Sequence, residues 1–107
     1  MKYSVLLTGG AKRDLTDLAA YIAEHDSLAK ADQLLDGIVD IIDALETMPE
    51  RGRHPPELLD LGFRDIRERF FKPYRILYRI DGHRVSILLI ADGRRDMKAL
   101  LMQRLLD

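Results

Sequence analysis

Arginine is the residue type in this sequence whose spacing could do chemistry. In the segment RDIRERFFKPYRILYRIDGHR, residues 64–84, an arginine recurs every few positions, although the formal net charge of the 107-residue chain is only -1. A guanidinium group presents its N–H donors in a planar fork that matches a carboxylate or a phosphate. Closely spaced arginines therefore suggest a partner that carries negative charge.

Charge is unevenly distributed along the chain. Residues 1–50 hold 4 basic and 10 acidic side chains, whereas residues 51–107 hold 13 basic and 8 acidic side chains. This asymmetry points to an anionic partner for the second half, because the summed field of a surface steers association. The acidic first half could equally repel nucleic acid.

Several other kinds of chemistry are excluded. The chain has no cysteine, so it has no disulfide, thiolate metal site or cysteine nucleophile. His25, His54 and His83 are isolated and lack the spacing of metal ligands, so we expect no metal and no cofactor. The length fits one domain, residues 1–107. Without a long apolar run or a signal peptide, we expect a cytoplasmic protein that makes no membrane contact.

The first half of the chain predicts one strand followed by two helices. MKYSVLL alternates between two sets of side chains, as a short strand does. Thr8 is a candidate N-cap for a helix that ends near His25, and a second helix ends at Met48 because Pro49 follows. The short connection predicts an antiparallel hairpin. Its apolar residues at helical spacing are Ala11, Leu15, Leu18, Ala19 and Ile22, then Ala31, Leu34, Leu35, Ile38, Ile41, Ile42 and Leu45.

The second half predicts strands and a last helix. A loop rich in proline and glycine, residues 49–62, precedes three expected strands at about residues 63–70, 74–80 and 84–91. The segment DGRRDMKALLMQRLLD predicts a final helix capped by Asp92, with Arg94 and Arg95 in its first turn, where the helix dipole disfavours cations. The predicted fold is α+β in the order β-α-α-β-β-β-α, with the helical hairpin packed on a small, mainly antiparallel sheet.

The hairpin around IDGHR determines where its arginines point. Side chains alternate between the faces of a strand, and a loop at Asp81-Gly82 or at Gly82-His83 gives the same pairing of faces. With the first loop, Arg79 would lie opposite Arg84, an unfavourable pairing of like charges. The expected core face consists of Tyr74, Ile76, Tyr78, Ile80, Val85, Ile87 and Leu89. The other face is expected to be open and carries Arg75, Leu77, Arg79, Arg84, Ser86 and Leu88.

Two more arginines, Arg67 and Arg69, join the open face if Ile66 and Phe70 point inward. Asp65, Glu68 or Asp81 could neutralise any one arginine and leave the face merely solvated. Five arginines interleaved with leucines are more typical of a binding surface with apolar anchors. The predicted partner-binding residues are Arg67, Arg75, Leu77, Arg79, Arg84, Leu88, Arg94 and Arg95, and no catalytic residue is predicted.

Several short motifs follow one another in a fixed order. They are RDL at residues 13–15, Pro49 with GR at residues 52–53, YRILYRIDG at residues 74–82 and GRRD at residues 93–96. In this order and at this length, the chain resembles the RelE/ParE superfamily of toxins from bacterial toxin–antitoxin modules. The resemblance covers nearly the whole sequence. It departs from the usual pattern at Gly9 and Gly10, where many relatives have better helix formers, and at Asp92, where ParE-like chains often carry histidine.

The superfamily divides by target. RelE-like members cut mRNA in the ribosomal A site, whereas ParE-like members bind DNA gyrase and trap it on cut DNA. The first activity requires a base, an acid and cations, drawn from lysines, arginines and a late tyrosine or histidine. The segment after Ala91 has neither tyrosine nor histidine, and the sequence pI is about 6.3. The resemblance therefore favours a gyrase-binding toxin without catalysis, with a ribosome-dependent endoribonuclease as the alternative and an inactive homologue as a third reading.

The resemblance also implies a cognate antitoxin and a hetero-oligomer with it. Antitoxins of this superfamily have a C-terminal segment that is disordered when free and wraps the toxin as helix and strand. We expect its acidic side chains to pair with the arginines around Arg75, Arg79 and Arg95, and its apolar side chains to cover the helical hairpin and the surface beside Leu77 and Leu88.

Overall fold

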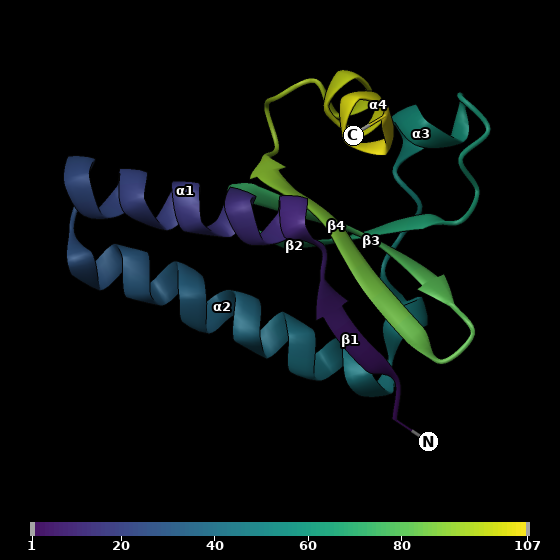
Figure 1. Ribbon diagram of the computed structural model, residues 1–107, viewed down its shortest axis with the longest axis horizontal. Helices are drawn as coiled ribbons and strands as arrows, with labels where there is room; N and C mark the ends of the chain where they lie inside the picture. Colours follow the sequence, from purple (N-terminus) through teal and green to yellow (C-terminus); the bar gives the residue numbers. More distant parts are fainter. Residues whose placement is uncertain (1, 107) are drawn as a thin grey trace.

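The protein folds into a four-stranded sheet with helices on both faces (Figure 1). The computed structural model describes residues 2–106. In chain order, the elements are β1 (Ser4–Leu7), α1 (Gly9–His25), α2 (Leu28–Thr47), a 3-10 turn (Pro49–Arg51), α3 (Pro56–Leu59), β2 (Ile66–Phe71), β3 (Tyr74–Asp81), β4 (Arg84–Asp92) and α4 (Met97–Leu106). The predicted α+β class and order of elements are confirmed.

Local capping sets the bounds of the helical hairpin. The Thr8 hydroxyl accepts a hydrogen bond from the Ala11 N–H at 3.2 Å, and the Ser27 hydroxyl accepts one from the Lys30 N–H at 3.1 Å. Each bond satisfies a backbone donor that the first turn of a helix leaves free. At the other end of α2, Met48 is the C-cap, and Pro49 follows it. Thr8 is therefore the N-cap, and α2 ends where the sequence predicted.

The sheet has the strand order β1-β4-β3-β2, in which β1 runs parallel to β4 and the other pairs are antiparallel. Asp81 pairs with Arg84, so the loop between β3 and β4 is Gly82-His83. Gly82 has φ +60°, as the first position of a tight hairpin turn requires. Arg79 consequently lies opposite Ser86 and not opposite Arg84. The like-charge pairing considered for the alternative turn does not occur.

Each face of the sheet carries its own apolar cluster. The helical hairpin covers one face, and the buried residues there are Ala11, Leu34, Ile38, Ile41, Leu45, Ile76, Tyr78, Val85, Ile87 and Ile90. Short α3 and α4 cover part of the other face, and the buried residues there are Leu58, Ile66, Leu77, Leu88, Leu89, Ala91, Met97 and Leu101. The second cluster explains why the opposite sheet face is not open along its whole length.

A bulge in β4 changes which side chains share a face. Leu77 pairs with Leu89, but the next residue, Tyr78, pairs with Ile87, so Leu88 is an extra residue in the ladder. Beyond the bulge the alternation is inverted, and Leu89 joins the cluster under α4 while Ile90 joins the cluster under the helical hairpin. The prediction that Leu89 lies on the hairpin face is therefore wrong. The prediction assumed regular alternation along both strands, and nothing in the sequence marks the extra residue at Leu88.

The register of β2 also differs from the prediction. Ile66 pairs with Arg79 and Arg67 pairs with Tyr78, so paired residues share a face. Ile66 and Phe70 thus lie on the α3 and α4 face, whereas Arg67 and Arg69 lie on the face that the helical hairpin covers. The expectation that Arg67 and Arg69 share an open face with Arg75 is wrong, because Ile66 fills the second apolar cluster and not the first.

The final helix begins later than predicted. The Asp96 side chain accepts from the Ala99 N–H at 3.1 Å and caps α4, whereas Asp92 is the last residue of β4. Arg94 and Arg95 lie in the turn before the helix and not in its first turn. None of the helices formed by residues 2–106 is long and apolar enough to cross a membrane.

Candidate partner-binding surface

Arg75 lies at the centre of a buried ion network. Its Nε donates to Glu68 at 2.6 Å, and its two terminal nitrogens donate to the carboxylate of Glu57 at 2.6 and 3.1 Å. Glu68 is only 1% exposed and also accepts from Arg53 Nε at 2.7 Å. Positive and negative side chains thus alternate from Arg53 through Glu68 and Arg75 to Glu57, and they join β2 and β3 to the first turn of α3.

Within the network, Glu57 and Arg75 each favour the charged form of the other. The hydrogen bond from Arg75 lowers the pKa of the Glu57 carboxyl below its ordinary value. Hydrogen bonds to Glu57 and Glu68 raise the pKa of Arg75 in turn, despite its burial. Because two carboxylates enclose this guanidinium and it is only 8% exposed, the expectation of Arg75 on an open sheet face is wrong. Sequence alone identified Glu68 as one possible partner but not Glu57, which is 18 residues away.

The two leucines predicted as exposed anchors are buried. Leu77 is 0% exposed and Leu88 is 9% exposed, and both belong to the cluster that α3 and α4 cover. Met97 and Leu101 of α4 supply the apolar side chains that pack against them. The expectation of exposed anchors at Leu77 and Leu88 is therefore wrong, because the last helix folds back over the sheet face that the strand pattern alone left open.

Arg79 and Arg84 lie in the part of this face that the helices leave uncovered. Arg79 is partly exposed, and its Nε lies 2.8 Å from Asp65 Oδ2. Arg84 is exposed and pairs with Asp81 across the hairpin and with Ser4 of β1. These two arginines remain predicted partner-binding residues.

Arg94 and Arg95 stand beside each other in the turn between β4 and α4. Arg94 donates through its side chain and its backbone N–H to the carboxylate of Asp92, which lowers the pKa of that carboxyl. Asp92 therefore organises this turn and does not cap the helix. Both arginines are exposed and remain predicted partner-binding residues.

Arg67 holds a loop in place. One of its terminal nitrogens donates to the backbone carbonyl of Glu50 at 3.0 Å and to that of Gly52 at 2.9 Å. This guanidinium fixes the chain between α2 and α3 against β2. Arg67 was predicted to bind a partner. In the fold, its terminal nitrogen holds the backbone of the loop between α2 and α3.

An ion pair between α1 and α4 has no counterpart among the sequence predictions. Asp14 and Arg104 form two hydrogen bonds of 2.9 and 2.8 Å between their side chains, 90 residues apart in sequence. The sequence feature that could have pointed to this contact is the pair Gly9-Gly10 at the start of α1. A Cβ atom on Gly10 would lie 2.7 Å from the Arg104 side chain, so the glycine makes room for the arginine to cross the helix.

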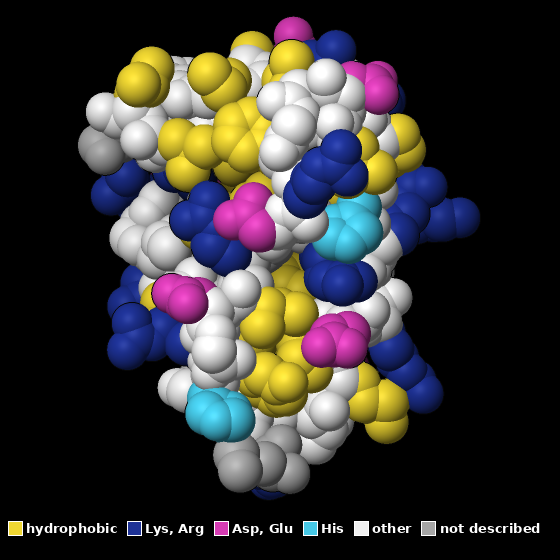
Figure 2. All heavy atoms as spheres, turned by 90° about the vertical axis from the view of Figure 1, so that its right-hand side faces the viewer, with side chains coloured by type: hydrophobic (Ala, Val, Ile, Leu, Met, Phe, Trp, Pro, Cys, Tyr) yellow, Lys and Arg dark blue, Asp and Glu magenta, His cyan; other side chains and the backbone are white. Residues whose placement is uncertain are grey.

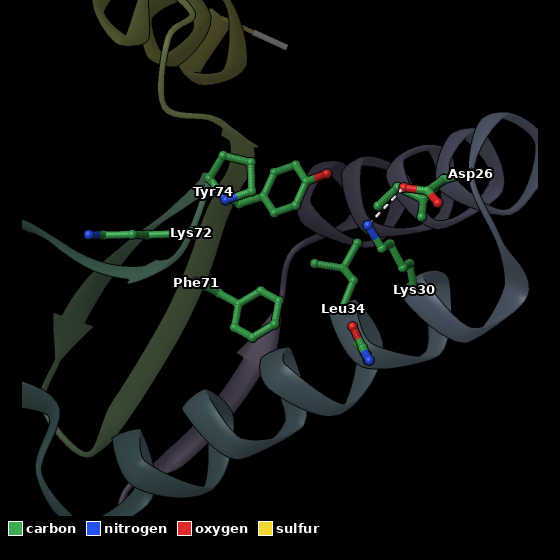
Figure 3. A pocket seen from close by; sticks show the side chains of 9 residues that line it. Asp26, Lys30, Leu34, Phe71, Lys72 and Tyr74 are labelled. Carbon is green, nitrogen blue, oxygen red and sulfur yellow. Dashed lines mark ion pairs between the residues drawn. The ribbon is translucent and has the colours of Figure 1, made fainter.

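A pocket opens between the end of the helical hairpin and the turn that joins β2 to β3 (Figure 3). Tyr74 and Phe71 project into it from the sheet, Leu34 forms part of its apolar side, and Lys30 is paired with Asp26 at 3.3 Å. Burial and the nearby Asp92 raise the pKa of the Tyr74 hydroxyl. Tyr74 thus remains protonated at neutral pH and faces the helices, away from the buried ion network.

Charged side chains surround more than one apolar area of the surface. On the side shown in Figure 2, hydrophobic side chains gather in separate areas, with Lys and Arg side chains beside them and Asp and Glu side chains between. Within residues 2–106, no group of three or more His, Asp or Glu side chains could hold a metal ion.

Comparisons with known proteins agree with this architecture. Toxin ParE3 from Caulobacter vibrioides is 30% identical over 97 residues, which cover 91% of this chain and 93% of that protein. A chain of the chromosomal ParDE system from P. aeruginosa has the same fold, with a TM-score of 0.69 at 20% identity over 85% of this chain and 96% of that one. A chain of the RelBE2 toxin–antitoxin complex from Mycobacterium tuberculosis gives a TM-score of 0.59 at 27% identity over 86% and 99% of the two chains.

The match to a protein family is extensive. Residues 5–97 match the family described as the ParE toxin of the type II toxin–antitoxin system parDE. This range includes β1 except Ser4, the helical hairpin, α3 and the whole of the other three strands, but only the first residue of α4. It therefore includes every arginine discussed above except Arg104. The chain belongs to the ParE toxin family, within the RelE/ParE superfamily.

Proposed function

We propose that this protein inhibits DNA gyrase by binding it and has no catalytic activity of its own. The observation that carries the proposal is the buried ion network. An enzyme that cleaves RNA through its 2′-OH needs accessible cations for the phosphate, together with a base and an acid. Arg75 is enclosed by Glu57 and Glu68 and is therefore withheld from an external phosphate.

The hydroxyl of Tyr78 is also fully used by contacts within the fold. The Tyr78 hydroxyl donates to the backbone carbonyl of Pro49 and accepts from the Gly52 N–H. Burial raises the pKa of Tyr78. A hydroxyl that is buried and bonded in both directions is unsuited to proton transfer with a substrate. A toxin that works by binding requires none of these groups, which favours gyrase over the ribosome as the target.

We further propose that an antitoxin covers the toxin before it reaches its target. Both solved neighbours named above come from toxin–antitoxin systems. On α2, Leu28, Leu35 and Val39 are exposed and extend the apolar side of the helix toward solvent. An acidic antitoxin segment can place apolar side chains there and carboxylates near four of the predicted partner-binding arginines that solvent reaches, Arg79, Arg84, Arg94 and Arg95. Hydrogen exchange should then show new protection on α1 and α2 and on the uncovered parts of β3 and β4.

The target is tested by incubating purified toxin with gyrase, ATP and supercoiled plasmid, followed by denaturation and electrophoresis. Gyrase inhibition through trapped cleavage predicts linear plasmid that accumulates with toxin concentration and disappears when the antitoxin is added first. A parallel reaction replaces gyrase with a translating ribosome and a labelled mRNA. Cleaved mRNA together with intact plasmid would contradict the proposal and favour the ribonuclease. Antitoxin binding without either effect would identify an inactive homologue.

A further inference from the structure

A hollow at the outer edge of β2 brings together positive charge and an exposed aromatic ring. The loop between α2 and α3 runs along this edge and is joined to it by a bridge between Arg53 and Glu68. The hollow has a volume of about 250 Å³. Its lining residues are Arg51, Gly52, Arg53, Glu68, Arg69 and Phe70.

The loop is irregular in conformation but firmly held. Tyr78 bonds to Pro49 and to Gly52, Arg67 bonds to the carbonyls of Glu50 and Gly52, and the Glu68 N–H donates to the Arg53 carbonyl at 2.8 Å. A Cβ atom on Gly52 would collide with the Tyr78 hydroxyl and the Glu68 carbonyl, so only glycine permits this approach. These contacts fix the backbone from which Arg51 and Arg53 project before any ligand arrives, which lowers the entropy that the loop loses on binding.

The positive charge of the hollow is only partly neutralised. Its one carboxylate, Glu68, is buried and shared between Arg53 and Arg75. Within residues 2–106, no ion pair engages the side chain of Arg51 or of Arg69. Arg51 is exposed and Arg69 is half-buried, so both guanidinium groups can reach a ligand at the edge of the sheet.

The aromatic ring stands beside these charges. Phe70 is 45% exposed, and the Arg53 guanidinium lies 5.1 Å from the centre of its ring. Arg69 projects from the face of β2 opposite to Phe70, so only Arg53 stacks on the ring, while Arg51 and Arg69 line the same hollow around the edge of the strand. An edge of this kind suits a flexible anionic chain with flat groups. Phosphates would meet the guanidinium groups, and a base would stack against the ring.

We infer that this hollow, the β2-edge site, binds a single-stranded nucleic-acid segment through Arg51, Arg69 and Phe70. The inference rests on the proposed function, in which the toxin acts where gyrase holds cut DNA. An acidic peptide would satisfy the arginines but would leave the exposed ring without a matching flat partner. The loop that carries Arg51 and Arg53 has a second role in this interpretation, because Tyr78 and Arg67 hold it at the distance from β2 that the site requires.

Direct binding tests the site without gyrase. Fluorescence anisotropy should be measured with purified toxin and a labelled single-stranded DNA oligonucleotide at several salt concentrations. Arg51→Ala combined with Arg69→Ala should weaken binding about tenfold or more at low salt and should reduce the slope of log affinity against log salt by roughly one for each arginine. Phe70→Leu keeps apolar volume but not the ring, and it should weaken binding about tenfold with little change in that slope. Phe70→Tyr should retain the wild-type affinity.

Matched controls separate this site from general charge effects. Lys12→Ala combined with Arg13→Ala removes two exposed cations from α1 and should leave binding within about twofold of wild type. Circular dichroism would establish that every variant is folded. An RNA oligonucleotide of the same sequence tests whether the site prefers DNA or RNA. A labelled oligoglutamate tests the acidic-peptide alternative.

Four outcomes of the binding assay would overturn the inference. They are absent DNA binding at low salt, equal losses for the α1 and β2-edge variants, RNA bound far more tightly than DNA, and oligoglutamate bound as tightly as DNA. The plasmid assay is independent of this one. Oligonucleotide binding without trapped gyrase would contradict the proposed function alone, whereas trapped gyrase with an intact response in the Arg51 and Arg69 double variant would contradict the β2-edge site alone.

Discussion

Asp14 of α1 and Arg104 of α4 bind each other and the backbone of β4, beyond the point where β1 stops pairing with it. β1 pairs with β4 only as far as Ile87. Beyond it, the Leu88 carbonyl accepts from Arg104 at 2.7 Å and the Ile90 N–H donates to Asp14 at 2.9 Å. The two side chains also bind each other, so the exposed backbone groups of an edge are satisfied while α4 is fastened to α1.

Removal of this ion pair should loosen α4. Arg104→Ala leaves the Asp14 carboxylate and the Leu88 carbonyl without their donor, and we expect the free energy of unfolding to fall by about 1–3 kcal/mol, allowing for the partial exposure of the pair. Urea denaturation followed by circular dichroism gives this value. Arg13→Ala removes an exposed arginine of α1 and should stay within about 0.5 kcal/mol of wild type. Equal effects of the two variants would contradict the structural role of Arg104.

The two neighbouring glycines of α1 should respond in opposite directions to alanine. A Cβ on Gly10 meets the Arg104 side chain at 2.7 Å, so Gly10→Ala should lower stability by about 1–3 kcal/mol as overpacking does. A Cβ on Gly9 has its nearest neighbour at 3.6 Å, and the higher helix propensity of alanine should leave Gly9→Ala neutral or stabilising by up to about 1 kcal/mol. Thermal unfolding of both variants makes the comparison. A stabilised Gly10→Ala would show that Arg104 is free to move aside.

Charge reversal should separate the buried arginine from the partly exposed one. Arg75→Glu places a third carboxylate beside Glu57 and Glu68, and we expect a loss of more than about 3 kcal/mol or outright unfolding. Arg79→Glu gives up a partly exposed pair with Asp65 and should change stability by less than about 1 kcal/mol. Urea unfolding and antitoxin binding should be measured for both. Arg79→Glu is expected to be folded and to bind antitoxin less tightly, whereas a stable Arg75→Glu protein would mean that the buried ion network is dispensable.

Acid should weaken the attachment of α3. The folded pKa of Glu57 lies below its ordinary value of 4.5, because Arg75 donates hydrogen bonds to its charged form. Its contribution to stability is fully present above that ordinary value and is lost as the pH falls through the lower folded pKa. The difference in unfolding free energy between wild type and Glu57→Gln should therefore be largest near neutral pH and should shrink in acid. A difference that is independent of pH would contradict an ionic role for Glu57.

The sequence by itself determined the elements whose causes are local. Thr8 caps α1, Pro49 follows the end of α2, and Gly82 shapes the turn between β3 and β4, because each acts through groups a few residues away. Side-chain alternation in β3 also placed Tyr74, Ile76, Tyr78 and Ile80 on the correct face, against the helical hairpin. Family resemblance and the order of elements followed from the same local patterns.

Only the tertiary structure decided what the arginines contact. The extra residue at Leu88 exchanges the two side-chain faces at the end of β4. The burial of Ile66 under α3 and α4 sets which side chains of β2 point to each face. Helix α4 covers Leu77 and Leu88, which strand alternation alone left exposed. Glu57 then reaches Arg75 from a helix 18 residues earlier in the chain. These contacts join segments far apart in sequence, and their geometry depends on how whole elements pack to fill two apolar clusters. Residue types and spacing indicated that the arginines need anions. Packing determined that Arg75 finds its anions inside the fold, whereas the exposed Arg51 and the half-buried Arg69 form no ion pair within residues 2–106.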